Sequence, residues 1–165
     1  MIDKFKEKGI IESGTFHLKS GLISNTYINL KKIISYPDLH LQLCNEIFNK
    51  INKEENILIC GTPYGAVPFA SYISIKNDIP MIFLRKGQKE YGTNQLIEGE
   101  FTEGQKVILI EDVITSGKSV IDSAEKLEGH GLIISQIIAA FSRAENKELM
   151  YKDIPIDFLY HMDDI

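Results

Sequence analysis

Short runs of branched apolar residues recur along the chain, and each is followed by a segment rich in glycine, serine or proline. The longest run covers residues 132–141, and shorter runs lie at 57–60, 80–84 and 106–110. Continuous apolar runs of this kind are typical of strands that are buried on both faces of a parallel sheet. We therefore expect these four segments to form the centre of one sheet.

Between these runs the apolar positions follow a helical period. Apolar residues at 39, 43, 47 and 51 predict a helix with one buried stripe, and it opens at the capping sequence Ser35-Tyr36-Pro37-Asp38. Further helices are expected over 66–75 and from residue 119 to a stop at Gly129. Strands that alternate with helices indicate an α/β fold with a mostly parallel sheet.

The two ends of the chain predict shorter elements. Residues 2–11 predict a short helix that closes near Gly9, and two short strands are expected near 16–19 and over 26–30. A short helix is expected before a final strand at 156–160. No linker or repeat divides the sequence, so we expect residues 1–165 to form a single domain.

Composition narrows the class of protein. The chain has 165 residues, is 44% hydrophobic and 25% charged, and carries a formal net charge of −5. The negative charge argues against non-specific binding of nucleic acid. Cys44 and Cys60 lie in apolar surroundings, which predicts buried free thiols. No apolar segment of membrane-spanning length and no secretory signal is present, so a cytoplasmic protein is expected.

Candidate chemistry follows the run at 106–110. Glu111 and Asp112 come directly after it, and the small-residue loop 115–119 follows before the next helix. Ligands of α/β sheets bind at the carboxyl ends of strands, and N–H groups of such a loop can converge on an anion. The carboxylates can accept hydrogen bonds from sugar hydroxyls or help hold a metal-bound group. A helix cap alone would explain the loop, but two acids after a buried strand are costly unless something uses them. The combination suits a ribose 5-phosphate.

Two other loops have features of ligand sites. The segment 61–68 follows the run at 57–60 with two glycines and two prolines, which is consistent with an anion site and equally with a tight turn. The segment 85–93 has three cations and one acid, a local charge of +2 in an acidic protein. A solvated loop would explain that charge, but its hydrogen-bond donors follow a predicted strand, as do those of the other two loops.

Five motifs resemble those of the orotate phosphoribosyltransferase family, in the family's order. Residues 111–119, Glu-Asp-Val-Ile-Thr-Ser-Gly-Lys-Ser, resemble the diphosphate-sugar signature of type I phosphoribosyltransferases. Residues 16–21, with Ser24-x-x-Tyr27-x-Asn29 after them, resemble the family's amino-terminal segment. Residues 85–93 resemble its catalytic lid, and 96–100 and Arg143 match two further motifs. The resemblance implies the type I fold, with helices flanking a mostly parallel sheet and a small hood from about residues 1–35 plus the C-terminal segment.

The resemblance also implies an activity. The family transfers the 5-phosphoribosyl group of 5-phosphoribosyl 1-diphosphate to orotate, which gives orotidine 5′-phosphate and diphosphate in de novo pyrimidine (UMP) biosynthesis. It implies Mg²⁺ held mainly by the donor and water, with no direct protein ligand. It further implies a homodimer in which the lid reaches the neighbouring site, and it leaves open a separate orotidine 5′-phosphate decarboxylase as partner.

Residue roles carry over at matching positions. Lys89 is expected to be the main catalytic cation, with Arg85 and Lys86 assisting, while Glu111 and Asp112 grip the ribose hydroxyls. The residues implied in donor binding are Lys19, Pro63, Tyr64, Arg85, Lys86, Lys89, Tyr91, Glu111, Asp112, Val113, Ile114, Thr115, Ser116, Gly117, Lys118 and Ser119. Those implied in orotate binding are Tyr27, Ile28, Thr115 and Arg143.

The sequence departs from some family members and leaves two alternatives. Tyr64 and Tyr91 stand where some bacterial members have lysine and histidine. Purine-salvage relatives commonly have aspartate at the position of Thr115, which makes a purine the weaker expectation for the base. A non-catalytic regulator would be expected to lack the lid lysines and to show a basic face, whereas this acidic chain keeps Lys86 and Lys89.

Overall fold

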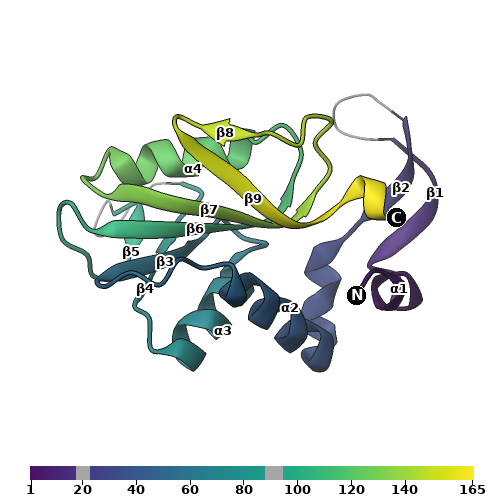
Figure 1. Ribbon diagram of the computed structural model, residues 1–165, viewed down its shortest axis with the longest axis horizontal. Helices are drawn as coiled ribbons and strands as arrows, with labels where there is room; N and C mark the ends of the chain where they lie inside the picture. The colour runs from purple at the N-terminus through teal and green to yellow at the C-terminus, as the bar shows by residue number, and fades with distance from the viewer. Residues whose placement is uncertain (18–22, 88–94) are drawn as a thin grey trace.

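A computed structural model shows a seven-stranded sheet with helices on both faces, and a two-stranded sheet beside it (Figure 1). The structure describes residues 1–17, 23–87 and 95–165. The strand order of the larger sheet is β5-β4-β3-β6-β7-β9-β8. This is the α/β architecture with a mostly parallel sheet that the sequence predicts.

The middle of the sheet is parallel throughout. It consists of β3 (Ile57–Gly61), β4 (Met81–Leu84), β6 (Lys106–Ile114), β7 (Ile133–Ser142) and β9 (Ile154–His161). The predicted runs at 57–60 and 106–110 lie within β3 and β6, and those at 80–84 and 132–141 lie in β4 and β7 except for their first residues. Short antiparallel strands flank them: β5 (Ile97–Glu98) pairs with β4, and β8 (Met150–Tyr151) pairs with β9.

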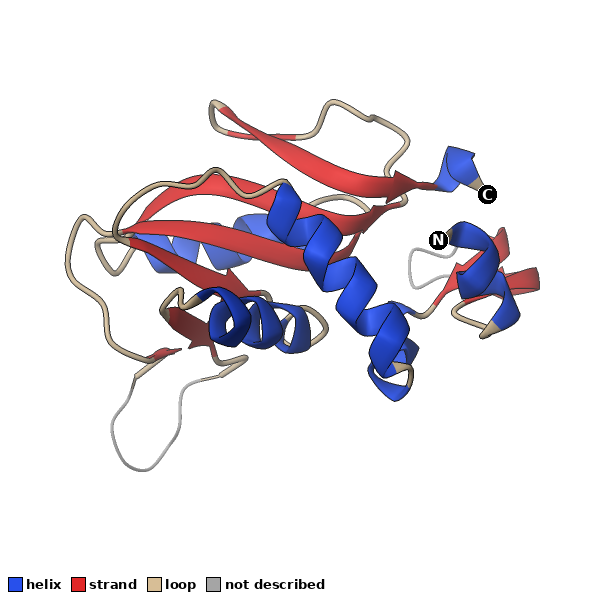
Figure 2. Cartoon of the chain, turned by 60° about the horizontal axis from the view of Figure 1, so that its bottom comes forward, coloured by secondary structure: helices blue, strands red, loops and turns tan. Residues whose placement is uncertain are grey.

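Three helices cover the sheet. Helices α2 (Pro37–Asn49) and α3 (Val67–Asn77) lie on one face, and α4 (Lys118–Glu128) lies on the other (Figures 1 and 2). Alternate residues of the central strands supply the two cores. In β6, Ile108 and Ile110 belong to the core under α2 and α3, whereas Val107 and Leu109 belong to the core under α4. This alternation is what a strand buried on both faces requires.

The amino-terminal segment forms the smaller sheet. It contains α1 (Ile2–Glu7), β1 (Ile11–His17), β2 (Ile23–Ile28) and the 3-10 helix η1 (Leu30–Ser35), which leads into α2. The chain ends in a second 3-10 helix, η2 (Met162–Asp164), which lies close to α1 in Figure 1. The Lys6 ammonium donates to the backbone oxygen of Ile165 at 3.1 Å, so the two ends of the chain are in contact.

The two strands predicted near 16–19 and over 26–30 begin earlier, at Ile11 and Ile23. Two predictions of helices in these terminal regions also need correction. The first helix ends at Glu7, because Gly9 adopts a left-handed backbone and Ile11 begins β1. The helix expected before the last strand is wrong: residues 150–151 form β8 and turn back into β9. Tyr151 is buried there and its hydroxyl donates to Glu128 at 2.6 Å, so side-chain burial favours the hairpin.

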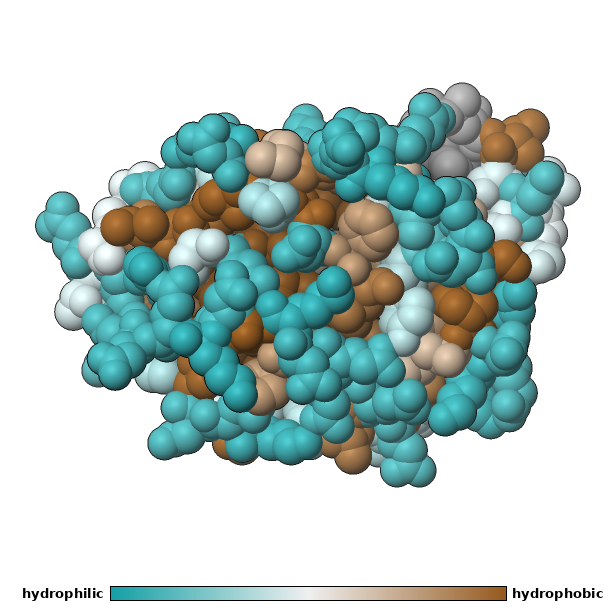
Figure 3. Space-filling view, viewed as in Figure 1, coloured by the Kyte–Doolittle hydropathy of each residue, from teal (hydrophilic) through white to brown (hydrophobic). Residues whose placement is uncertain are grey.

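Surface and core have the chemical character that the composition predicts. Hydrophilic side chains cover most of the face in Figure 3, and apolar side chains show between them. Cys44 and Cys60 are buried free thiols, as predicted. Among the helices of the described ranges, none is both long and apolar enough to cross a membrane.

Candidate active site

The carboxyl ends of β3, β6 and β7 bring three of the predicted segments to one edge of the sheet. Gly61, the last residue of β3, pairs with Ile110, and Ile114, the last residue of β6, pairs with Ser142. The loop 62–66, the loop 115–117 and Arg143 follow directly from these positions. The edge predicted to bind the ligand therefore carries all three.

The two acids lie inside β6 and not after it. Pairing with β7 continues to Ile114, and Glu111 and Asp112 are only 3% and 7% exposed. The expectation that the strand ends before the acids is wrong, because β7 extends far enough to pair with three further positions of β6. The acids consequently follow the alternation of the strand. Glu111 faces the α4 side of the sheet and Asp112 faces the side of α2 and α3.

Glu111 joins three segments by hydrogen bonds. Its Oε1 accepts from the Thr62 hydroxyl at 2.6 Å and from the backbone N–H of Asp112 at 3.0 Å. Its Oε2 accepts from the Ser119 hydroxyl at 2.6 Å. Thr62 follows β3 and Ser119 lies in the first turn of α4, so this carboxyl group ties the β3 loop and the helix start to β6. Both oxygens of Glu111 are engaged within the protein.

Asp112 has a different environment. Its Oδ2 lies 2.9 Å from the ammonium of Lys31, which comes from η1. Its carboxylate also lies against the backbone of Gly65, where an added Cβ would come within 1.9 Å of Oδ2. Gly65 belongs to the loop whose Pro63–Tyr64 peptide bond is cis. A glycine is required at position 65 for the carboxylate to take this position.

Burial and mutual proximity separate the pKa values of the acids. Burial, with a further contribution from the Asp112 carboxyl, raises the pKa of Glu111 to about 7, against the opposing effect of the Ser119 and Thr62 hydroxyls. Burial also acts to raise the pKa of Asp112, but its hydrogen bond with Glu111 and the Lys31 ammonium outweigh this, and that pKa is lowered. Asp112 is thus the member of the pair that carries the charge first.

The loop before α4 has the backbone of an anion site. Gly117 precedes the helix with φ +79°, a conformation that favours glycine, and α4 begins at Lys118. The N–H groups of a first helical turn have no partner within the helix, and the helix dipole favours negative charge there. Thr115 and Ser116 are exposed beside them, whereas Val113 and Ile114 are more buried and pack in the core.

Arg143 lies between this loop and the smaller sheet. Its backbone N–H donates to Ile114 at 2.8 Å, and its Nη2 makes long contacts of 3.4 Å to the Ser24 hydroxyl and 3.5 Å to the Thr26 oxygen. Ser24 and Thr26 belong to β2, the strand of the predicted base-binding residues. There Tyr27 is 40% exposed and stacks on Phe16, and Ile28 is buried.

The predicted lid is described only at its base. The Arg85 guanidinium pairs with Glu98 of β5 at 2.9 Å, which turns it toward the sheet edge. The Lys86 ammonium lies 4.7 Å from the centre of the Tyr64 ring, so it reaches the loop after β3. Lys19, Lys89 and Tyr91 lie outside the described residues.

Three residues of this edge are absent from the predictions. Thr62 and Gly65 belong to the loop after β3, in which donor binding is predicted only for Pro63 and Tyr64. The hydroxyl of Thr62, directly after a buried strand, is a sequence signal that could have indicated a site residue. Lys31 gives no signal in the sequence. It reads as a solvated lysine, and its contact with Asp112 spans 81 positions.

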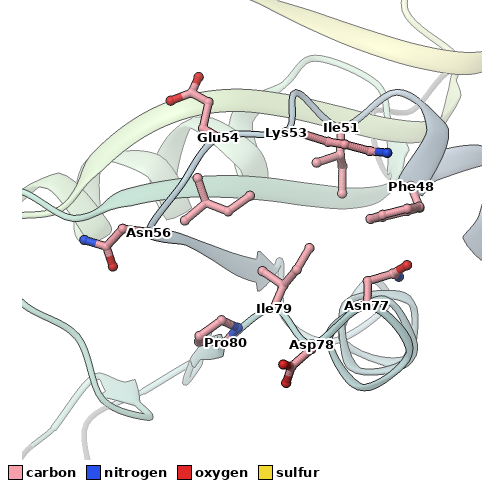
Figure 4. A pocket seen from close by; sticks show the side chains of 10 residues that line it. Phe48, Ile51, Lys53, Glu54, Asn56, Asn77, Asp78, Ile79 and Pro80 are labelled. Atoms are coloured by element: carbon pink, nitrogen blue, oxygen red, sulfur yellow. The ribbon is translucent and has the colours of Figure 1, made fainter.

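A pocket of about 390 Å³ opens at the opposite edge of the sheet (Figure 4). It lies where β3 and β4 begin, with Phe48, Ile51 and Ile79 among its lining residues. Two of its polar side chains are already paired: Glu54 pairs with Lys106, and Asn56 accepts from Gln105 at 3.0 Å. The charged and hydroxyl groups suited to a phosphosugar gather at the carboxyl edge, so we place the candidate site there.

Comparisons with known proteins identify the family and agree with the observed fold. Residues 36–159 match the family model of the phosphoribosyl transferase domain. The chain is 38% identical over 154 residues to an orotate phosphoribosyltransferase of Methanocaldococcus jannaschii, which covers 93% of this chain and 87% of that protein. It is 41% identical over 134 residues to a uridine 5′-monophosphate synthase of Bos taurus, which covers 80% of this chain but 28% of that protein.

A solved structure shares the whole architecture. The orotate phosphoribosyltransferase of Aeropyrum pernix has a TM-score of 0.84 over 99% of this chain and 95% of that chain. The sequences are 24% identical, so this likeness concerns the fold.

Proposed function

This chain belongs to the phosphoribosyl transferase domain family, as an orotate phosphoribosyltransferase, and from that premise we propose how its site works. The reaction transfers the 5-phosphoribosyl group of 5-phosphoribosyl 1-diphosphate to orotate. It yields orotidine 5′-phosphate and diphosphate, a step of pyrimidine biosynthesis. The observation that carries the proposal is the meeting of an ionised carboxylate, a helix-start loop and an arginine at one sheet edge.

The donor is held by its sugar and its 5-phosphate. The backbone N–H groups at 115–119 bind the phosphate, aided by the hydroxyls of Thr115 and Ser116, while the Ser119 hydroxyl donates to Glu111. Asp112 accepts from the ribose hydroxyls. Glu111 shares that task in our proposal only where a hydroxyl displaces one of its internal donors, because both its oxygens are engaged. Fixing the sugar this way orients the anomeric carbon for attack.

Orotate is held through its carboxylate. The guanidinium of Arg143 offers a planar fork that suits a carboxylate, and it lies beside the strand of Tyr27 and Ile28. The backbone of Arg143 pairs with Ile114, the residue before Thr115. The ring nitrogen of orotate then attacks the anomeric carbon, and diphosphate leaves. No nucleophile from the protein is needed for this displacement.

The departing diphosphate requires positive charge. We assign this to Lys89 with Lys86 and Arg85 of the lid, and to Lys19, and we expect closure of the lid to exclude water. Pro63 and Tyr64 would line the same side, where Lys86 already contacts the Tyr64 ring. Arg85 would have to leave Glu98 to take part.

Mg²⁺ fits this site as a companion of the donor. In the residues that the structure describes, no group of three or more His, Cys, Asp or Glu side chains could hold a metal ion. Mg²⁺ is commonly held by substrate phosphates and water, and when bound it would neutralise charge on the diphosphate.

The organisation of the protein is also proposed. We propose one domain over residues 1–165, in which α1, β1 and β2 with the C-terminal segment form a hood over the base. A cytoplasmic homodimer with a shared lid suits the family. The chain aligns with 28% of the Bos taurus synthase, which leaves room there for a second activity, so a separate orotidine 5′-phosphate decarboxylase is a reasonable partner here.

An absorbance assay tests the function. The protein with donor and Mg²⁺ should consume orotate and should leave hypoxanthine and uracil unchanged. Arg143→Gln should raise the KM for orotate about thirtyfold or more, because losing one partner of a close charge pair costs about 2 kcal/mol or more. Lys147→Gln, which removes a nearby surface cation paired with Asp163, is the control. Turnover of a purine and none of orotate would contradict the proposal.

A further inference from the structure

The ion pair between Lys31 and Asp112 has no part in the reaction as outlined. Lys31 is the second residue of η1, four positions after Tyr27, and its ammonium reaches back to the carboxyl edge of β6. The side chain of Asp112 is 9% exposed, whereas that of Lys31 is 66% exposed. An exposed cation therefore meets a nearly buried anion.

The position of this contact matters because of the alternation along β6. Glu111 faces α4 and is fully engaged by Thr62, Ser119 and its own strand. Asp112 faces the other side, fixed against Gly65, and holds Lys31 at 2.9 Å. The acceptor best placed for ribose hydroxyls is the one that Lys31 already occupies.

We propose that Lys31 is a positioning residue that keeps the Asp112 carboxylate charged and aimed in the free enzyme, and yields it to the ribose hydroxyls when the donor binds. This rests on the proposed function only in that the donor supplies a phosphorylated sugar with adjacent hydroxyls. Two hydroxyl groups replace the ammonium as donors to the carboxylate. The ammonium returns to solvent, and no bond is broken.

The need for a cation follows from the charges around Asp112. Glu111 is the adjacent acid on the same strand, and Lys31 is the cation that η1 brings to it. The loop 62–66, packed against the carboxylate, has no charged side chain and only the ionisable Tyr64. Without Lys31, a buried carboxyl beside another would retain a proton to higher pH, and a protonated Asp112 accepts hydroxyl hydrogen bonds less well.

Calorimetry of donor binding without a base tests this directly. Lys31→Met keeps the apolar stem and removes the charge. At about pH 6 it should weaken donor binding about tenfold, and at about pH 8.5 less than about twofold, because Asp112 ionises unaided at the higher pH. Lys31→Arg should restore binding at both values. Lys32→Met is the matched control, since Lys32 lies on the same helix but pairs with Glu12 at 2.7 Å.

The outcomes separate the possibilities. Equal weakening of Lys31→Met at both pH values would overturn the proposal, because it would mean a direct contact with the donor or a structural role. No weakening at either pH would overturn it as well. Thermal midpoints of Lys31→Met and Lys32→Met, compared at both pH values, exclude simple unfolding as the cause. If the wild type binds the donor but does not react with orotate, the proposed function fails while this test of Lys31 still stands.

Discussion

At the scale of single residues, the acids of the site differ because neighbouring positions of a strand face opposite sides of the sheet. Glu111 is surrounded by Thr62 and Ser119 on the α4 side, and Asp112 meets Lys31 and Gly65 on the other. A motif of two adjacent acids therefore supplies one carboxyl that holds two neighbouring segments to β6 and one carboxylate that can accept hydrogen bonds from a ligand. The roles differ although the residue types are nearly the same.

Glu111 predicts a dependence of stability on pH. Its pKa is about 7 in the folded chain against an ordinary value of 4.5, so the folded state binds its proton more tightly than the unfolded state. The stabilising contribution is complete below pH 4.5 and is lost as the pH rises through about 7. Glu111→Gln cannot ionise, so it does not lose this contribution as the pH rises. Its free energy of unfolding, relative to that of the wild type, should therefore increase by up to about 3 kcal/mol between pH 4.5 and about pH 7.

Urea unfolding of both proteins near pH 5 and pH 8 measures this difference. Glu125→Gln, which changes an exposed residue of α4, is the control and should follow the wild type. Parallel stability profiles of Glu111→Gln and the wild type would show that the carboxyl is not held protonated by its surroundings.

At the scale of elements, the site depends on close contact between the loop after β3 and the end of β6. Gly65 makes this contact possible, since the Asp112 carboxylate occupies the space of a side chain at that position. The same loop supplies Thr62 to Glu111. One short loop thus controls the positions of both acids.

Gly65→Ala should consequently impair catalysis more than folding. The added Cβ would lie 1.9 Å from Oδ2 of Asp112, so the carboxylate or the loop must move. A displacement of about 1 Å in such a group can cost about a hundredfold, and we expect kcat/KM for the donor to fall about tenfold to a hundredfold. Steady-state kinetics would measure it. Gly129→Ala, at the end of α4, should retain wild-type kinetics; equal kinetics for the two variants would contradict the assigned contact.

The elements were more accessible to sequence reasoning than their contacts. The apolar runs predicted β3, β4, β6 and β7, because burial on both faces leaves short continuous runs of apolar, mostly branched residues. The helix expected before β9 was wrong, because the burial of Tyr151 against Glu128 is a tertiary effect. Lys31 was not predictable, since its partner is remote in sequence and an exposed lysine fits any surface. The side that each acid faces depends on the extension of β6 to Ile114, which the apolar run ending at Ile110 does not indicate.

At the scale of the whole molecule, two apolar layers are separated by one sheet. Cys44 belongs to the layer of α2 and α3, and Cys60 to the layer of α4. Both are fully buried, and burial raises the pKa of each thiol to about 12. The cysteines therefore report on the two layers independently.

Thiol labelling should show that the layers unfold together. In the native protein both cysteines should react about a thousandfold or more slowly than in the denatured chain, because thiolate and access are both lacking. Both should become reactive over the same range of urea, as expected for one cooperative domain. Mass spectrometry of the labelled peptides resolves the two sites. Labelling of Cys44 at urea concentrations that leave Cys60 protected would reveal separate unfolding of one layer.

The parallel pairing of the central strands also affects how the chain folds. The pairings join positions that are far apart in the sequence, such as Gly61 with Ile110, so chain entropy is lost before the contact forms. Folding is accordingly expected to be slow for this length, with the apolar segments of β6 and β7 unpaired meanwhile and open to aggregation. Because the donor site is assembled from the ends of three such strands, a ligand can bind only after they have met. Substrate will therefore retard unfolding far more than it hastens folding, and it will protect the finished enzyme without guiding the nascent chain.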